Sequence, residues 1–160
     1  MLEEEEVIIM EKGIKIISEN RKARHDYFLE NAIECGIVLQ GTEIKAMRCH
    51  SVNISDSYVI IRNGEAYILN MDIAPYDKGN IYNHDAKRTR KLLLHKNEIL
   101  KLKGKIDTKG YTLIPTKVYL SSGRAKIEVA LAKGKKDYDK RETEKQRDVK
   151  REMDKYKKWN

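Results

Sequence analysis

Residues 58–69 read YVIIRNGEAYIL, and this stretch decides the fold class. Tyr58–Arg62 and Glu65–Leu69 are rich in β-branched and aromatic residues, which favour a strand. Asn63-Gly64 lies between them, and this dipeptide tolerates the positive φ angles that a two-residue hairpin turn requires. The stretch therefore predicts an antiparallel β-hairpin.

Other segments of strand character surround this hairpin. A second hairpin is expected over residues 111–132, with its turn at Ser121-Ser122-Gly123. In its second strand Ile127, Val129 and Leu131 alternate with polar residues, as in a strand with one buried face. Further strands are predicted at Val7–Met10, Ile14–Ile17 and Ile37–Met47.

Two segments have the pattern of helices. Apolar residues on one face predict a helix over Asn20–Gly36, where Gly36 follows the last turn. A second helical segment is expected over Asp85–Ile106, and His95 followed by Glu98 resembles a capping box where one helix stops and another starts. Short antiparallel strands with helices between them predict a β-rich fold built on a small barrel, a common architecture of nucleic-acid readers.

The C-terminal segment carries the strongest charge. Lys133–Asn160 holds twelve Lys and Arg against seven Asp and Glu, which is five of the chain's net eight positive charges. Such a segment buries too little apolar surface to offset the entropy of ordering itself. We therefore expect a body over 1–132, with an acidic leader at 1–6, and a basic tail over 133–160 that is disordered when free and helical where a polyanion receives it.

Composition excludes several classes of protein. No apolar run approaches the ~20 residues of a membrane span, and the acidic start of the chain is unlike a secretory signal. Cys35 and Cys49 have no metal-ligand spacing, so we expect reduced thiols in a cytoplasmic protein, with no metal site and no cofactor. The net charge of +8 favours a polyanionic partner, and the tail aromatics Tyr138, Tyr156 and Trp159 favour RNA.

Two basic clusters lie in the body, each at an expected helix start. One consists of Arg21, Lys22 and Arg24, and the other of Arg88, Arg90 and Lys91. Cations at a helix N-terminus oppose the helix dipole, whereas the backbone N–H groups there attract phosphate. The clusters are therefore either phosphate-binding sites or solvated helix starts, and the sequence weighs the two interpretations evenly.

Five stretches together resemble one family, that of SsrA-binding protein, also called small protein B. They contain NRKARHDYF (20–28), QGTEIK (40–45), SDSYV with NGEA (55–66), NHD with RTRKLLL (83–94), and AKGKK with DKRE (132–142). The motifs stand in the family's order and the resemblance covers about Gly13 to Arg151. It is therefore far more specific than a single basic run.

The resemblance implies an oligonucleotide-binding-like antiparallel barrel with about three helices, and a role in ribosome rescue by trans-translation. Members bind the tRNA-like domain of transfer-messenger RNA and enter a stalled ribosome with it. The tail then folds as a helix in the empty messenger channel, and the nascent chain is tagged for degradation. The implied partners are transfer-messenger RNA, the decoding region and messenger channel of the small ribosomal subunit, and, indirectly, elongation factor Tu.

The resemblance also implies functional residues. Asn20, Glu34 and Leu93 match positions that grip the tRNA-like domain, and the two basic clusters are added on physical grounds as phosphate contacts. Because a carboxylate repels phosphate, we expect Glu34 to accept hydrogen bonds from a base edge; the alternative is an exposed acid in the last helical turn. The residues expected in the messenger channel are Lys133, Lys135, Lys136, Tyr138, Asp139, Lys140 and Arg141.

The chain departs from the family pattern at two positions. Tyr138 stands where many members have His, so a role that needs a charged imidazole fails here. Ala86 stands where the pattern usually has Pro, and we expect this change to matter little.

Two other functions compete with this interpretation. An enzyme would need His25-Asp26 or His84-Asp85 as its acid–base pair, but adjacent helical residues point in different directions, so we expect no catalytic residue. A generic barrel-type RNA-binding or ribosome-assembly protein would bind many RNAs with a steep salt dependence. Such a protein would have no reason to need Glu34 and Leu93.

Overall fold

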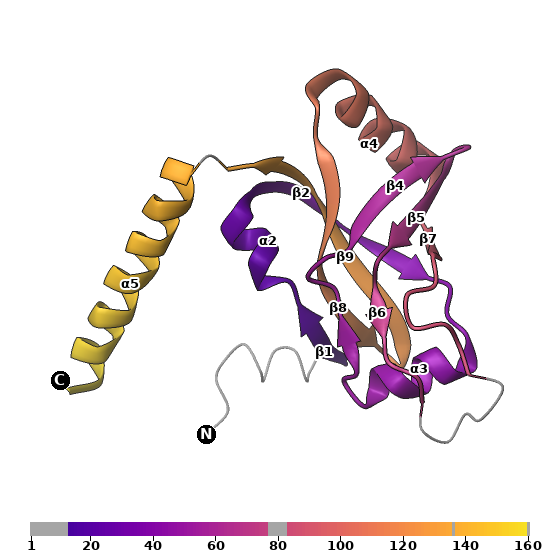
Figure 1. Ribbon diagram of the computed structural model, residues 1–160, viewed down its shortest axis with the longest axis horizontal. Helices are drawn as coiled ribbons and strands as arrows, with labels where there is room; N and C mark the ends of the chain where they lie inside the picture. The colour runs from indigo at the N-terminus through magenta and orange to yellow at the C-terminus, as the bar shows by residue number, and fades with distance from the viewer. Residues whose placement is uncertain (1–12, 77–82, 136, 160) are drawn as a thin grey trace.

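The computed structural model describes residues 13–76, 83–135 and 137–159 (Figure 1). For residues 137–139, 143 and 154–159 only the backbone is described. The helices are α2 (Arg21–Asp26), α3 (Gly41–Arg48), α4 (Lys96–Lys109) and α5 (Asp137–Trp159). The strands are β1 (Ile14–Glu19), β2 (Tyr27–Ile37), β3 (Val52–Asn53), β4 (Tyr58–Arg62), β5 (Glu65–Leu69), β6 (Asp72–Ile73), β7 (Arg90–Leu93), β8 (Thr112–Ser121) and β9 (Arg124–Gly134).

The larger sheet is antiparallel and curls on itself. Its strand order is β1-β8-β4-β5-β7-β2-β9, and β9 pairs with β8 as well as with β2, so the pairings lead around the sheet and back to β8. The inward faces bury aliphatic side chains such as Val59, Ile68, Leu92, Val129 and Leu131. Figure 1 shows α3 at one end of this curled sheet and α4 at the opposite end.

Both predicted hairpins are confirmed. β4 and β5 pair from Tyr58 with Leu69 to Arg62 with Glu65, and the turn residue Asn63 has the expected positive φ of 52°. β8 and β9 form the second hairpin, with pairing from Ser121 and Arg124 at the turn to Thr112 and Ala132. The strand predicted at Ile14–Ile17 is also present, as β1 against β8. The strand predicted at Val7–Met10 lies outside the described residues.

The helix predicted over Asn20–Gly36 is wrong for most of its length. Only α2 is helical, and from Tyr27 onward the chain is the long strand β2, which pairs with β9. A register shift between Glu30 and Ile33, with Asn31 at a φ of 52°, marks a bulge that interrupts the strict alternation of a strand. Because of the bulge, the apolar residues of this segment do not alternate as they would in a regular strand. The segment is a strand because it pairs with β9, about a hundred residues later in the chain.

Two further predictions need correction. The strand predicted over Ile37–Met47 is instead mostly α3, which buries Ala46 and Met47 against the core. The helical segment predicted over Asp85–Ile106 contains the strand β7 in its first half, and α4 begins only after His95. In β7 the side chains of Arg90 and Leu92 are buried on the same inward face. The leucine run after the basic residues therefore has a strand period of two.

At the level of class, the sequence prediction holds, because the chain is β-rich with an antiparallel sheet and several helices. β9 continues two residues past Ala132, so Lys133 and Gly134 still pair with Phe28 and Tyr27 of β2. No helix among the described residues is long and apolar enough to span a membrane.

Candidate nucleic-acid interface

Glu34 and Leu93, far apart in sequence, line one open pocket. β2 and β7 pair so that Gly36 lies opposite Leu93, and the pocket of about 330 Å³ is lined by Glu34, Gly36, Leu93, Leu94, His95, Glu98 and Lys126. The Leu93 side chain is directed outward, since Leu93 is 53% exposed. Leu93 therefore adds apolar surface to a pocket that also contains the carboxylate of Glu34.

The carboxylate of Glu34 has defined neighbours on the outer face of the sheet. Lys126 Nζ lies 3.9 Å from Glu34 Oε1, and the Tyr119 hydroxyl donates to the Glu34 carboxylate. Burial, together with this hydrogen bond, raises the pKa of Tyr119. Glu34 is therefore on a strand, not in the last helical turn, and about half of its side chain is exposed.

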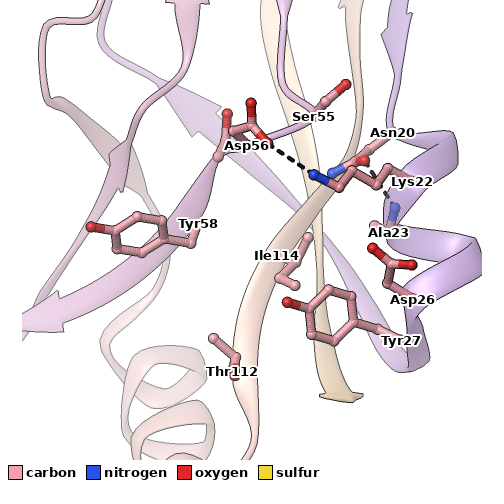
Figure 2. Close-up of a pocket in the computed structure, with 11 residues that line it drawn as sticks. Asn20, Lys22, Ala23, Asp26, Tyr27, Ser55, Asp56, Tyr58, Thr112 and Ile114 are labelled. Carbon is pink, nitrogen blue, oxygen red and sulfur yellow. Dashed lines mark hydrogen bonds and ion pairs between the residues drawn. The ribbon is translucent and has the colours of Figure 1, made fainter. Parts of the chain in front are cut away.

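Asn20 has a different position from the one its predicted role requires. It is 1% exposed, its side-chain oxygen accepts from Ala23 N at the start of α2, and its amide donates to the carbonyls of Ile54 and Pro115. Figure 2 shows Asn20 among the residues that line a pocket, with the dashed line to Ala23. The side chain of Asn20 therefore joins the start of α2 to strand β8 and to the loop that follows β3.

The pocket of Figure 2, about 310 Å³, lies in front of Asn20 and is bounded by α2, β4 and β8. Lys22 crosses its mouth to Asp56 at 3.2 Å, and the hydrogen bond with Asp56 raises the pKa of Lys22. Tyr27 and Tyr58 also line this pocket. Arg21, Lys22 and Arg24 are all exposed, so the first basic cluster is available to phosphate along α2.

All three residues of the second basic cluster are paired within the protein, but only Arg90 is buried. Arg90 is fully buried and donates to Glu43, to Met71 O and to Ala86 O, so it has no exposed surface with which to contact a phosphate. Arg88 also donates to Glu43, at 2.6 Å, and Lys91 pairs with Glu65 at 2.9 Å. The cluster also does not start a helix, because Arg90 and Lys91 begin the strand β7. The prediction that Arg90 contacts phosphate is therefore wrong, and its role is structural.

The predicted tail residues divide between strand and helix. Lys133 is the penultimate residue of β9, and Lys135 donates its backbone N–H to Asp26 O while its ammonium lies 5.1 Å from the centroid of the Phe28 ring. Lys140 and Arg141 are on α5, where Lys140 lies 3.8 Å from Asp26. Lys136 and the side chains of Tyr138 and Asp139 lie outside the described residues.

The histidines have specific partners. His84 is buried, with Thr42 Oγ1 at 2.9 Å from Nδ1 and the carbonyl of Ile73 at 2.8 Å from Nε2, so it holds α3 to β6. The expectation that neighbouring His and Asp side chains point apart is wrong for His25, whose Nδ1 lies 2.8 Å from Asp26. Among the described residues no group of three or more His, Cys, Asp and Glu is placed to hold a metal ion.

Sequence reasoning missed two features of this surface. Gly36 was assigned to a helix end, but a Cβ there would lie 3.1 Å from Leu93 Cβ, so a glycine is what lets β2 approach the leucine. Tyr119 was not singled out, because its contact with Glu34 needs the pairing of β2, β9 and β8.

Comparisons with known proteins show which family the chain resembles. A family model described as SmpB protein matches residues 17–159. The SsrA-binding protein of Desulfitobacterium hafniense is 54% identical over 145 residues, which is 91% of this chain and 93% of that protein. The SsrA-binding protein of Thermoanaerobacter pseudethanolicus is 57% identical over 143 residues, covering 89% and 92%.

A similar chain is found in a solved structure described as "tmRNA-SmpB: a journey to the center of the bacterial ribosome". It superimposes with a TM-score of 0.64 and 48% identity, over 75% of this chain and 85% of that one. Because the family model spans most of the described residues and the relatives match over nearly their full length, the chain belongs to the SmpB protein family.

Proposed function

We propose that this protein is a non-catalytic RNA-binding factor of trans-translation. It binds the tRNA-like domain of transfer-messenger RNA and takes it to stalled ribosomes in the cytoplasm. The names of its relatives support RNA binding, and the solved neighbour associates the family with transfer-messenger RNA and the ribosome. Elongation factor Tu participates through the aminoacylated RNA and not through a contact of its own with this chain.

The observation that carries the proposal is the meeting of Glu34 and Leu93 in one open pocket. An exposed leucine stacks against an unpaired base or sugar, and a carboxylate accepts hydrogen bonds from base N–H groups while it repels phosphate. The pair therefore selects a shape with an exposed base, which a uniform RNA helix lacks. Lys126 and the cations of α2 add attraction that depends little on sequence.

We further propose that the body is a closed barrel of oligonucleotide-binding type and that the tail is the ribosome-sensing part. The return of the strand pairings to β8 supports the first statement. The second is supported by the exposed charges of α5 and by its few contacts with the body. In the ribosome, Lys133, Lys135, Lys136, Tyr138, Asp139, Lys140 and Arg141 line the passage from the body to a helix in the empty messenger channel.

The test is equilibrium binding of the purified protein to the tRNA-like domain, with an alanine tRNA as competitor at physiological salt. We expect a preference of about a hundredfold, or about 2.7 kcal/mol. Glu34→Gln and Leu93→Ala should each remove most of that preference. Glu30→Gln on the same strand and Leu100→Ala on α4 are the matched controls, since both residues are exposed and neither lines the pocket.

Equal affinity for the two RNAs would contradict the proposal and favour the generic RNA-binding or ribosome-assembly function. In that case Leu93→Ala should change affinity no more than Leu100→Ala does. The affinity for both RNAs would also fall equally steeply as the salt concentration rises, since only phosphate contacts would remain.

A further inference from the structure

One contact between the tail helix α5 and the body is made by a histidine. His25, in the last turn of α2, lies with Nδ1 2.8 Å from Asp26 Oδ1 and with Nε2 2.6 Å from Glu144 Oε1. Asp26 is the next residue of the same helix, whereas Glu144 is on α5, 119 positions along the chain. One imidazole therefore joins two carboxylates that belong to different parts of the molecule.

The two contacts together require a charged ring. A neutral imidazole has one N–H, so it donates to one carboxylate and turns a lone pair toward the other. At 2.6 and 2.8 Å a lone pair facing a carboxylate oxygen is repulsive, whereas an imidazolium donates on both sides. The arrangement in the structure is therefore that of protonated His25.

A second contact lies one helical turn away on α5. Lys140 Nζ is 3.8 Å from Asp26 Oδ1, and residues 140 and 144 are neighbours on one face of the helix. Two attachment points one turn apart fix the direction of a helix axis, whereas a single point leaves it free to swing. The backbone N–H of Lys135, which donates to Asp26 O, holds the chain just before this helix.

We propose that His25 is a positioning residue that sets the direction in which α5 leaves the body, by holding Asp26 and Glu144 at once. The importance of this direction for function rests on the proposed role of the tail in the messenger channel, whereas the contacts themselves do not depend on that role. With His25 protonated the tail lies along α2, and with His25 neutral the helix is released from Glu144 and swings about the chain at Lys135. Figure 1 shows α5 leaving the body on the side of α2.

The charged groups around His25 give the expected pH dependence. Hydrogen bonding to Asp26 and then to Glu144 raises the pKa of His25 above its usual 6.5, and the hydrogen bond with His25 lowers the pKa of Asp26. Lys140 of α5 and Lys22 of α2 both act on Asp26, and Lys22 is also paired with Asp56. Because the pKa of His25 is raised in the attached state, attachment is favoured below the usual pKa and is lost as pH rises through the raised value.

The test is a distance measurement between two nitroxide labels by double electron–electron resonance on the full-length protein. One label is placed on Cys49, which is exposed, and the other on a Lys150→Cys variant in α5. Cys35 stays unlabelled because it is buried, and burial raises its pKa to about 12. We expect a narrow distance distribution at about pH 6 and a broad one at about pH 9.

Variants separate the charge of the ring from its bulk. His25→Gln and Glu144→Gln should give the broad distribution at both pH values, whereas His25→Arg, a permanent cation, should restore the narrow one at both. Asp148→Asn, one turn beyond Glu144 on α5, is the control and should match the unsubstituted protein. Circular dichroism identifies any variant with an unfolded body, and His25→Arg still tests the inference if His25→Gln fails to fold.

The inference is overturned if the distance distribution of the unsubstituted protein does not change with pH. It is also overturned if the distributions of His25→Gln and Glu144→Gln are as narrow as that of the control at about pH 6. Binding to the tRNA-like domain is measured on the same samples. We expect His25→Gln to keep that binding and to lose peptide tagging on stalled ribosomes. Absence of binding by the unsubstituted protein would refute the proposed function while leaving the distance result intact.

Discussion

At the scale of single residues, the carboxylate of Glu43 holds two arginines in place. Glu43 and Arg90 are both fully buried, and Arg88 reaches Glu43 from the rim. Burial alone would raise the pKa of Glu43, but the backbone N–H of Gln40 and the two guanidinium groups outweigh it and lower that pKa. The group joins α3 to β7, and thereby fixes the strand that carries Leu93.

We predict that Glu43→Gln lowers the free energy of unfolding by about 3 to 5 kcal/mol, because it leaves the buried charge of Arg90 unpaired. Urea denaturation at neutral pH measures this. Since the pKa of Glu43 is lowered in the folded state, its contribution is present above the ordinary carboxyl pKa and is lost as pH falls through the lowered value.

The control for that prediction is Glu65→Gln, which removes an ion pair with Lys91 at the surface. Its urea midpoint should stay close to that of the unsubstituted protein, because exposed ion pairs contribute little. Equal losses in the two variants would show that burial of the Glu43 carboxylate is not what makes it important.

The sequence nominates residues for the candidate site, but it does not give their environments. Lys22 and Leu93 are exposed, as a contact with RNA requires, whereas Asn20 and Arg90 are buried. An arginine in a run of basic residues gives no sign that a carboxylate 47 positions earlier will bury it. Whether such an arginine binds RNA or stabilises the core depends on the residues it contacts, and contacts between residues distant in sequence are known only from the fold.

At the scale of elements, local signals decided some strands and distant partners decided others. The β4–β5 hairpin was predictable because its turn dipeptide and its strand period lie within twelve residues. β2 was not, because its bulge disturbs the period and its partner is β9. The same holds for β7, whose run of leucines fits a helix as well as a strand until Arg90 and Leu92 are known to face inward together.

The close approach of β2 to β7 leads to a prediction about Gly36. In Gly36→Ala the new methyl group would lie 3.1 Å from Leu93 Cβ and would push that side chain aside. We expect a stability loss of about 1 to 3 kcal/mol, as for other overpacked sites. Affinity for the tRNA-like domain, measured by equilibrium titration, should fall as much as it does in Leu93→Ala.

Gly104→Ala is the matched control for this prediction. Gly104 is on the exposed side of α4, and nothing lies within 4 Å of the added methyl group. This variant should gain about 0.5 to 1 kcal/mol, since alanine favours a helix over glycine. If Gly36→Ala bound the RNA domain as well as Gly104→Ala does, the position of Leu93 would not matter for recognition.

At the scale of the whole molecule, most contacts lie within the sheet, and α5 makes few contacts with the rest of the chain. β9, the last strand of the body, ends at Gly134, and the ion pairs that join α5 to the body are with His25 and Asp26 of α2. The sequence prediction of this division came from a change in charge and hydropathy at Ala132. The last two residues of β9 were missed because strand pairing, not composition, sets that limit.

We predict that a chain ending at Gly134 binds the tRNA-like domain with nearly unchanged affinity but does not support tagging on stalled ribosomes. The reason is that Glu34, Leu93 and the cations of α2 all remain in the truncated body. Filter binding and an in vitro tagging assay measure the two activities. A truncated but folded body that no longer binds the RNA domain would contradict this division.

The double pairing of β9 also has a consequence for how the chain is made. Tyr27–Ile37 is synthesised long before its sheet partner Arg124–Gly134. Until β9 emerges, β2 and β8 each present an unpaired strand edge, and such edges are templates for association with other chains. A nascent chain that stops before Gly134 therefore cannot complete its sheet, and its fate is aggregation or proteolysis.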